Sequence, residues 1–287
     1  MKPGTTPLAK LADCKVRQSL HRMIGHWRRV TRTVCRSHLK LALTMTLSTG
    51  SAQHCLALAI QHVNADQPER AMQLCEHALA TWPADAAVLQ LLALLCLKAN
   101  QLGRAASAVE ASQELRPDHG PSLLVAGDVA RARRDLPTAL TFHRRAWKLL
   151  PERADAAQAL GLSLQASGES VEAARVLSQA VALAPGHTDA WFALALALHD
   201  TGDLAGAEAA LRRILTLAPA RAEVEVNLGI VLQEARRLEE AMRAYGRAYR
   251  LREDSFGRIA HALSSAPAGR LWLDLDRLRD TLHNMPA

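Results

Sequence analysis

Five prolines stand at intervals of 34 residues along the chain, at Pro83, Pro117, Pro151, Pro185 and Pro219. The chain holds only 12 prolines, so this regular spacing marks an internal repeat. One such unit cannot bury its own apolar surface, and neighbouring units must therefore stack. If each proline is position 32, the repeats span 52–85, 86–119, 120–153, 154–187, 188–221 and 222–255, the last with Glu253 in place of proline.

Other positions keep the same phase. Position 20 is alanine in all six repeats, and position 8 is always alanine or glycine. Positions 4, 7, 8 and 11 form an apolar stripe at helical spacing, and a second stripe follows a turn near Gly168 and Gly202. The small residues predict two helices that cross closely, and the proline ends the second helix. Each repeat is therefore predicted to be a helical hairpin.

These residues resemble the tetratricopeptide repeat (TPR) family over 204 of the 287 residues. The family's large aromatic residues are sparse, with Trp191 at position 4 and Tyr245 at position 24. The resemblance implies an all-α fold, a right-handed superhelical solenoid of antiparallel helix pairs. It also implies that the first helix of each repeat lines a concave face, and that the protein acts as a scaffold or adaptor for protein binding.

Residues 256–287 are predicted to cap the end of the solenoid, since a terminal repeat must cover its last apolar face. Phe256, Ile259 and Leu263 continue an amphipathic helix, and a break follows at 266–269. Asp274 or Asp276 would then cap a final helix. A functional tail is the alternative.

The basic charge of the chain is confined to its beginning. Residues 1–50 carry ten Lys or Arg and one acidic residue, whereas residues 51–287 carry 25 basic and 27 acidic residues. This distribution argues against a basic body that binds nucleic acid, and no nucleic-acid partner is expected. Residues 1–51 are predicted to form a separate basic segment.

Residues 16–36 show the pattern of an amphipathic helix, with apolar residues on one side and six arginines on the other. Three interpretations remain open. The segment is a degenerate hairpin over 18–51 that caps repeat one, or a helix that anchors the protein to an anionic membrane surface, for example in envelope or polysaccharide assembly, or a segment that occupies the protein's own groove.

The cysteines favour a reducing compartment, because five cysteines without paired spacing predict no disulfide framework. We therefore expect a cytoplasmic protein without a transmembrane helix. Peripheral membrane attachment is one alternative, and export is another if residues 23–52 are a signal segment.

No catalytic signature is present: the sequence lacks GxSxG, GxGxxG, HExxH and a phosphate-binding glycine loop. His62 and His143 fall at core positions 11 and 24 and are predicted to be core histidines. A basic cluster in repeat three, which includes Arg144 and Arg145, is predicted to be a solvated face rather than an anion site. We expect no enzymatic activity, no cofactor and no metal.

The predicted groove is unusually apolar. Positions 5, 9 and 12 of the first helices should face it, and position 9 is aliphatic in five of six repeats.

The chaperone-tail clamp and the asparagine ladder of other TPR proteins need repeated asparagines, and only Asn227 at position 6 matches. The pattern favours a partner protein that inserts an amphipathic helix or an extended apolar segment. The alternative is that these residues pack against neighbouring first helices. The candidate groove residues are Leu56, Ile60, Val63, Leu94, Leu97, Leu124, Arg131, Leu162, Phe192, Leu196, His199, Val226, Asn227 and Ile230.

Overall fold

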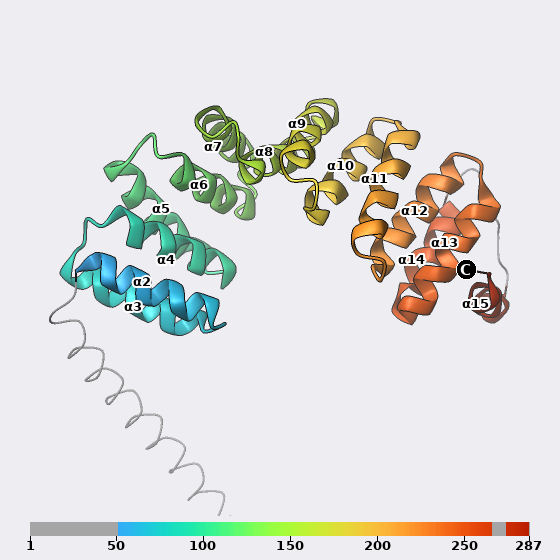
Figure 1. Ribbon diagram of the computed structural model, residues 1–287, viewed down its shortest axis with the longest axis horizontal. Helices are drawn as coiled ribbons and strands as arrows, with labels where there is room; N and C mark the ends of the chain where they lie inside the picture. The colour runs from blue at the N-terminus through green and yellow to red at the C-terminus, as the bar shows by residue number, and fades with distance from the viewer. Residues whose placement is uncertain (1–50, 266–273, 287) are drawn as a thin grey trace, which may run out of the picture. The chain divides into compact units, whose positions relative to one another are not determined.

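The computed structural model describes residues 51–265 and 274–286, and Figure 1 shows their helices. No strand occurs within these two ranges. The predictions for residues 1–50, including the amphipathic helix over 16–36, lie outside the described part of the chain. Among the residues described, no helix has the length and apolarity needed to cross a membrane.

The helices follow the 34-residue period without a shift. The first helices of the six repeats are α2 (Ala52–Asn64), α4 (Ala86–Lys98), α6 (Gly120–Ala132), α8 (Ala154–Ala166), α10 (Thr188–Asp200) and α12 (Ala222–Glu234). The second helices are α3 (Pro68–Thr81), α5 (Leu102–Leu115), α7 (Leu136–Leu149), α9 (Ser170–Leu183), α11 (Leu204–Leu217) and α13 (Leu238–Leu251). Every first helix therefore begins at position 1 and every second helix at position 17. The predicted all-α class built from helix pairs is confirmed.

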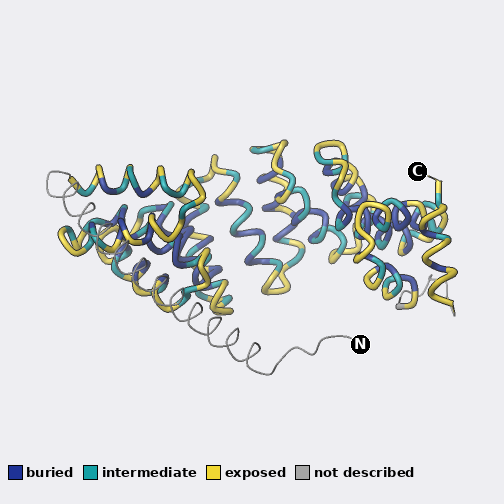
Figure 2. The backbone as a smooth tube through the Cα atoms, turned by 90° about the horizontal axis from the view of Figure 1, so that it is seen from below, coloured by how far each residue is buried: buried dark blue, intermediate teal, exposed yellow. Residues whose placement is uncertain are grey.

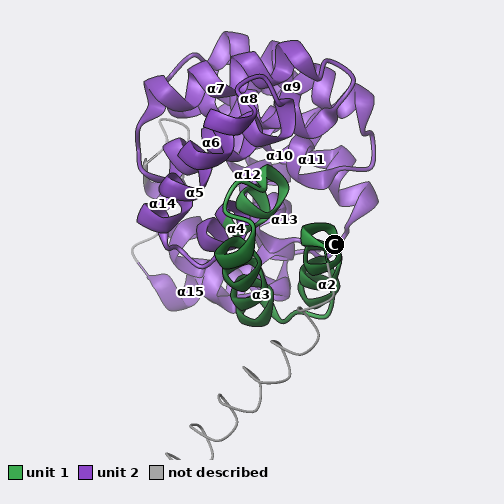
Figure 3. Ribbon diagram, turned by 90° about the vertical axis from the view of Figure 1, so that its left-hand side faces the viewer, with its two compact units in different colours: residues 1–92 green, residues 93–287 purple. Residues whose placement is uncertain are grey.

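The chain divides into two compact units between Leu92 and Ala93, within α4 (Figure 3). In the first unit, α2 packs against α3. In the second unit, each helix from α5 to α13 packs against the next one in sequence. The first helices α6, α8 and α10 also contact one another in succession. These nearest-neighbour contacts are those of a stacked repeat array.

The turn inside each hairpin has the same conformation in all six repeats. Position 15 has a positive φ everywhere, at Gly168 and Gly202 but also at four residues with side chains. Those four are Asp66, Asn100, Arg134 and Arg236. The next amide donates to the carbonyl of position 11 over 2.8–2.9 Å, as Gln101 does to Cys96. This bond satisfies a carbonyl that the helix end would leave free, which explains why the conformation persists without glycine.

The two helices of a repeat touch where their side chains are smallest. Each alanine at position 20 is completely buried. Buried and exposed residues alternate along the helices, as Figure 2 shows. In repeats three, four and six, a Cβ added to the glycine at position 8 would meet the residue at position 24 within 2.5 Å. These contacts pair Gly127 with His143, Gly161 with Leu177, and Gly229 with Tyr245.

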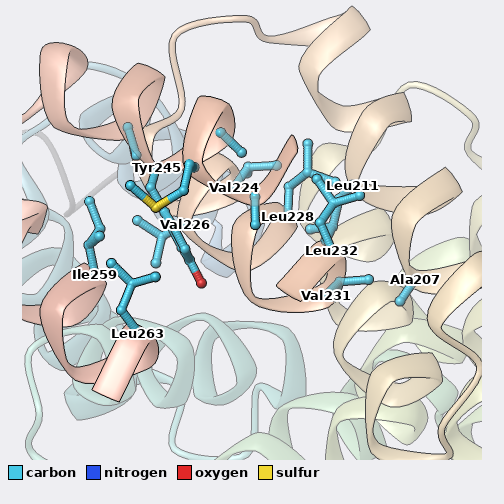
Figure 4. Packing of buried hydrophobic residues seen from close by; sticks show 14 of the residues in the cluster. Ala207, Leu211, Val224, Val226, Leu228, Val231, Leu232, Tyr245, Ile259 and Leu263 are labelled. Atoms are coloured by element: carbon cyan, nitrogen blue, oxygen red, sulfur yellow. The ribbon is translucent and has the colours of Figure 1, made fainter. Parts of the chain in front are cut away.

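After α13, repeat six ends in a 3-10 turn (Glu253–Ser255), and the chain continues through α14 (Phe256–Ser265) and α15 (Leu275–Asn284). α14 packs against α12, and α15 packs against α13. Ile259 and Leu263 of α14 join the buried cluster around Tyr245 (Figure 4). Of the two predicted caps, it is Asp274 whose carboxylate accepts from the first amides of α15. Both helices therefore lie where the sequence predicts a cap.

Candidate partner-binding groove

All fourteen candidate residues lie on first helices, but they differ in how much of each side chain is available. In the first unit, α2 presents Ile60 with 45% of its surface exposed, and Leu56 and Val63 are half-buried. These three residues follow one another at helical spacing. They form an apolar stripe along α2 that stays partly exposed.

In the second unit, six of the apolar candidates are half-buried, each with part of its side chain at the surface. They are Leu94 and Leu97 on α4, Leu162 on α8, Phe192 and Leu196 on α10, and Ile230 on α12. Leu162 packs against the core formed by α7 to α10. Phe192 and Ile230 pack against the next core, formed by α10 to α15. Each of these three side chains therefore both supports the core and shows an apolar surface.

Two candidates belong to the core and are unavailable to a partner. Val226 is completely buried, because it lies in the same cluster as Ile259 and Leu263 of α14. Leu124 is 8% exposed and packs with Ala156 of α8. Position 5 thus faces the next first helix in these repeats, and the structure corrects the expectation that these two residues line the groove surface.

In repeats four, five and six, the polar residue at position 12 joins the first helix to the following one. The Gln165 side chain donates to the carbonyl of Ala193 over 3.2 Å. His199 Nε2 lies 2.8 Å from Glu234 Oε2. The Gln233 amide donates to the carbonyl of Ala262 over 3.1 Å. These side chains are therefore structural ties, and the recurrence of a polar residue at one position in consecutive repeats was the signal for them.

Repeat three interrupts the apolar groove with an ion pair. Arg131 Nη2 lies 2.7 Å from Asp128 Oδ1, and about a third of each side chain is exposed. Asp128 also lies 3.7 Å from Nε2 of His143, which is completely buried beneath it. Arg131 is therefore already engaged within its own helix. Asn227 is engaged in the same way, since its amide donates to the carbonyl of Glu223.

His143 is a satisfied core histidine, as predicted. Its Nε2 lies 3.3 Å from the carbonyl oxygen of Leu124 and its Nδ1 lies 2.7 Å from Ser163 Oγ. Burial lowers the pKa of His143, so that the ring is neutral at neutral pH. A carbonyl can only accept, so the proton resides on Nε2 and the Ser163 hydroxyl donates to Nδ1. The ring thus joins α7 to α6 and α8.

The basic cluster of repeat three lies at the surface, and Arg144 and Arg145 within it are paired with acidic residues. Arg144 contacts Glu169 and Glu172 at 3.1 and 3.2 Å, and Arg145 contacts Asp118 at 2.8 Å. These exposed pairs need no external anion. Within the described ranges, no group of three His, Cys, Asp or Glu residues is arranged to hold a metal ion.

Residues 158–222 match a family model for the tetratricopeptide repeat. The match falls on α8 to α11, where helix bounds, small positions and turn geometry all follow the 34-residue period. Residues 158–222 are therefore tetratricopeptide repeats, and the helix pairs on either side keep the same 34-residue period. No curated protein matches its sequence.

Several solved structures share this fold, and two of those below are described as TPR proteins. The TPR protein TTC0263 of Thermus thermophilus is 25% identical, with a TM-score of 0.52 over 63% of this chain and 99% of that protein. YrrB, described as a TPR protein with an unusual peptide-binding site, is 23% identical, with a TM-score of 0.54 over 63% and 93%. PilF of Pseudomonas aeruginosa is 16% identical, with a TM-score of 0.62 over 70% and 92%. The TPR fold indicates a scaffold for protein–protein interaction, and proteins of this fold are generally not enzymes.

Proposed function

We propose that this TPR protein is a scaffold that binds an apolar or amphipathic segment of a partner protein along the first helices of its second unit. The observation that carries the proposal is the set of half-buried apolar side chains on α8, α10 and α12. Leu162, Leu196 and Ile230 occupy position 9 of three consecutive repeats. A surface of this kind suits a partner helix with apolar residues on one face.

The rigidity of this surface supports the proposal. Position 12 ties α8 to α10 through Gln165, and α10 to α12 through His199. A groove whose helices are already fixed loses little conformational freedom when a partner binds. The binding energy therefore comes mainly from burying the exposed parts of these apolar side chains.

The test is an affinity capture from native lysate with the full chain and a Phe192→Glu variant. We expect the variant to lose the bound partner, because a carboxylate would be buried against the partner's apolar face. Val171→Glu is the matched control, since Val171 is 77% exposed on α9, a second helix. Retention of the same partners by Phe192→Glu, or their equal loss in Val171→Glu, would contradict groove binding.

Attachment to an anionic membrane surface through residues 16–36 is the alternative function. It rests on the apolar and basic sides of that segment alone. A Trp27→Glu variant should then lose binding to anionic liposomes while the groove keeps its partner. For the location, we propose a reducing compartment such as the cytoplasm, which the free, buried thiols of Cys55 and Cys96 support.

A further inference from the structure

A cavity of about 550 Å³ lies in the second unit between α5, α6 and α7. Its floor is apolar and includes Val109 of α5 and Ala126 and Val129 of α6, with Phe142 of α7 as a wall. On α6, the residues at positions 7, 10 and 11 line the cavity floor, whereas the residues at positions 9 and 12 line the proposed groove. At 100° per residue these two sets point to opposite sides of the helix. The cavity is therefore separate from the proposed groove.

The cavity exists because two residues depart from the repeat pattern. Position 7 is leucine in five repeats, and repeat three alone has Ala126 there. Position 28 also departs from its pattern once: repeat two has Gln113 there, whereas the other five repeats have an apolar or aromatic residue. Those residues are Leu79, Trp147, Val181, Leu215 and Tyr249. Both exceptions line the one cavity. A repeat pattern broken twice at the same place is the mark expected of a functional site rather than of packing.

Three polar side chains of the cavity, all on α5, have no partner in the described part of the chain for the groups that line it. Nε2 of Gln113 is buried and has no hydrogen-bond partner among the described residues. Glu110 and Glu114 stand one turn apart on the same wall, and neither makes an ion pair with any residue in the described ranges. With Asp135 and Arg133 opposite, the lining carries three acidic groups and one basic group. An apolar floor below an acidic rim is complementary to a ligand that is both apolar and cationic.

We propose that this cavity is a second binding site that takes a protein segment in which a large apolar or aromatic side chain stands beside a lysine or arginine. The apolar side chain fills the space that Ala126 leaves, where other repeats hold leucine. A backbone carbonyl of the segment accepts from Gln113 Nε2. The basic side chain pairs with Glu110 and Glu114. The volume lies within the range of pockets that bury a ligand of this size.

The experiment is a selection of random displayed peptides on the full chain, run in parallel on an Ala126→Leu variant. That substitution restores the residue that five repeats carry, so the variant should fold, and thermal unfolding followed by circular dichroism checks this. We expect peptides with an aromatic–basic pair to be enriched on the original chain and to bind the variant at least about tenfold more weakly. Gln113→Leu fills the same space from α5 and should have the same effect.

The rim is tested with an enriched peptide on a Glu110→Gln, Glu114→Gln double variant. Binding should weaken, and its dependence on salt should diminish, because two carboxylates no longer attract the basic side chain. If no peptide distinguishes the original chain from Ala126→Leu, the site does not exist. If cavity-dependent peptides lack a basic residue, the proposed ligand class is wrong. Neither outcome bears on Phe192→Glu, so failure here leaves the groove proposal to its own test.

Discussion

Substitution of Gly229 by alanine should destabilise repeat six, although alanine favours a helix more than glycine does. A Cβ at residue 229 would lie 2.3 Å from Cε1 and 2.5 Å from Cδ1 of Tyr245. Carbon atoms pack at about 3.5–4.0 Å, so the ring would have to move by more than about 1 Å. The ring has no freedom to do so, because it is completely buried and its hydroxyl donates to Gln233 Oε1 over 2.8 Å.

The opposing contributions can be compared. Helix propensity favours alanine over glycine by about 1 kcal/mol. Overpacking costs about 1–3 kcal/mol, and loss of the hydrogen bond between Tyr245 and Gln233 costs about 1 kcal/mol more. We therefore expect Gly229→Ala to lower the free energy of unfolding by about 1–3 kcal/mol. Urea unfolding followed by far-UV circular dichroism measures it.

Gly161→Ala is the matched control. Its Cβ would lie 2.5 Å from Leu177 Cγ, which is also too close. However, repeat five already holds this pair as Ala195 and Leu211, both buried. A leucine in this position can therefore shift to admit alanine, and we expect a change of less than about 1 kcal/mol. If Gly229→Ala and Gly161→Ala lower the free energy of unfolding by the same amount, contact with the Tyr245 ring does not account for the effect at residue 229.

Three further predictions concern single side chains. Arg236→Gly should stabilise the protein by about 0.5–1 kcal/mol, because Arg236 has a φ of 63°, whereas Arg243→Gly inside α13 should destabilise it in the same melting assay. Because the pKa of His143 is lowered in the folded protein, the ring takes up its proton more readily in the unfolded chain. The contribution of His143 to the free energy of unfolding is therefore fully present above the ordinary pKa of about 6.5 and declines as the pH falls below it. Urea titrations across this range should show the decline, and His143→Leu should diminish it. Arg247 Nε and Nη2 lie 2.8 and 3.0 Å from the buried carboxylate of Glu225, so Arg247→Met should lower the free energy of unfolding in urea by about 3 kcal/mol. An additional Glu225→Leu substitution should recover much of this loss. If Arg247→Met leaves the free energy of unfolding unchanged, the pair is not buried in solution.

The repeat period gave reliable positions but not the role of every side chain. Position 8 was always small, and the structure shows that the glycines at this position face the residue at position 24. Gly127 and Gly229 leave room for the rings of His143 and Tyr245, whereas repeats four and five both carry leucine at position 24 and have Gly161 and Ala195 at position 8. This complementarity is visible in the sequence only after the two positions are known to touch.

The left-handed turn shows the limit of residue-type reasoning. Glycine at Gly168 and Gly202 indicated the turn, but arginine adopts the same φ at residues 134 and 236. The hydrogen bond from position 16 to position 11 is made in every repeat and overrides the preference of the residue. A local propensity therefore predicted the turn in only some of the repeats that contain it.

The sequence by itself determined the helix pairs, their 34-residue period and the small residues at which they cross, because a strict 34-residue period leaves one arrangement that buries every apolar stripe. Only the tertiary structure decided which groove residues are surface and which are core. Val226 is covered because α14 packs on α12, and no periodicity within a repeat specifies what the next helix covers. The cavity between α5, α6 and α7 is of the same kind. Gln113 and Ala126 are each ordinary residues, and only the packing of α5 against α6 brings these two exceptions to the lining of one cavity.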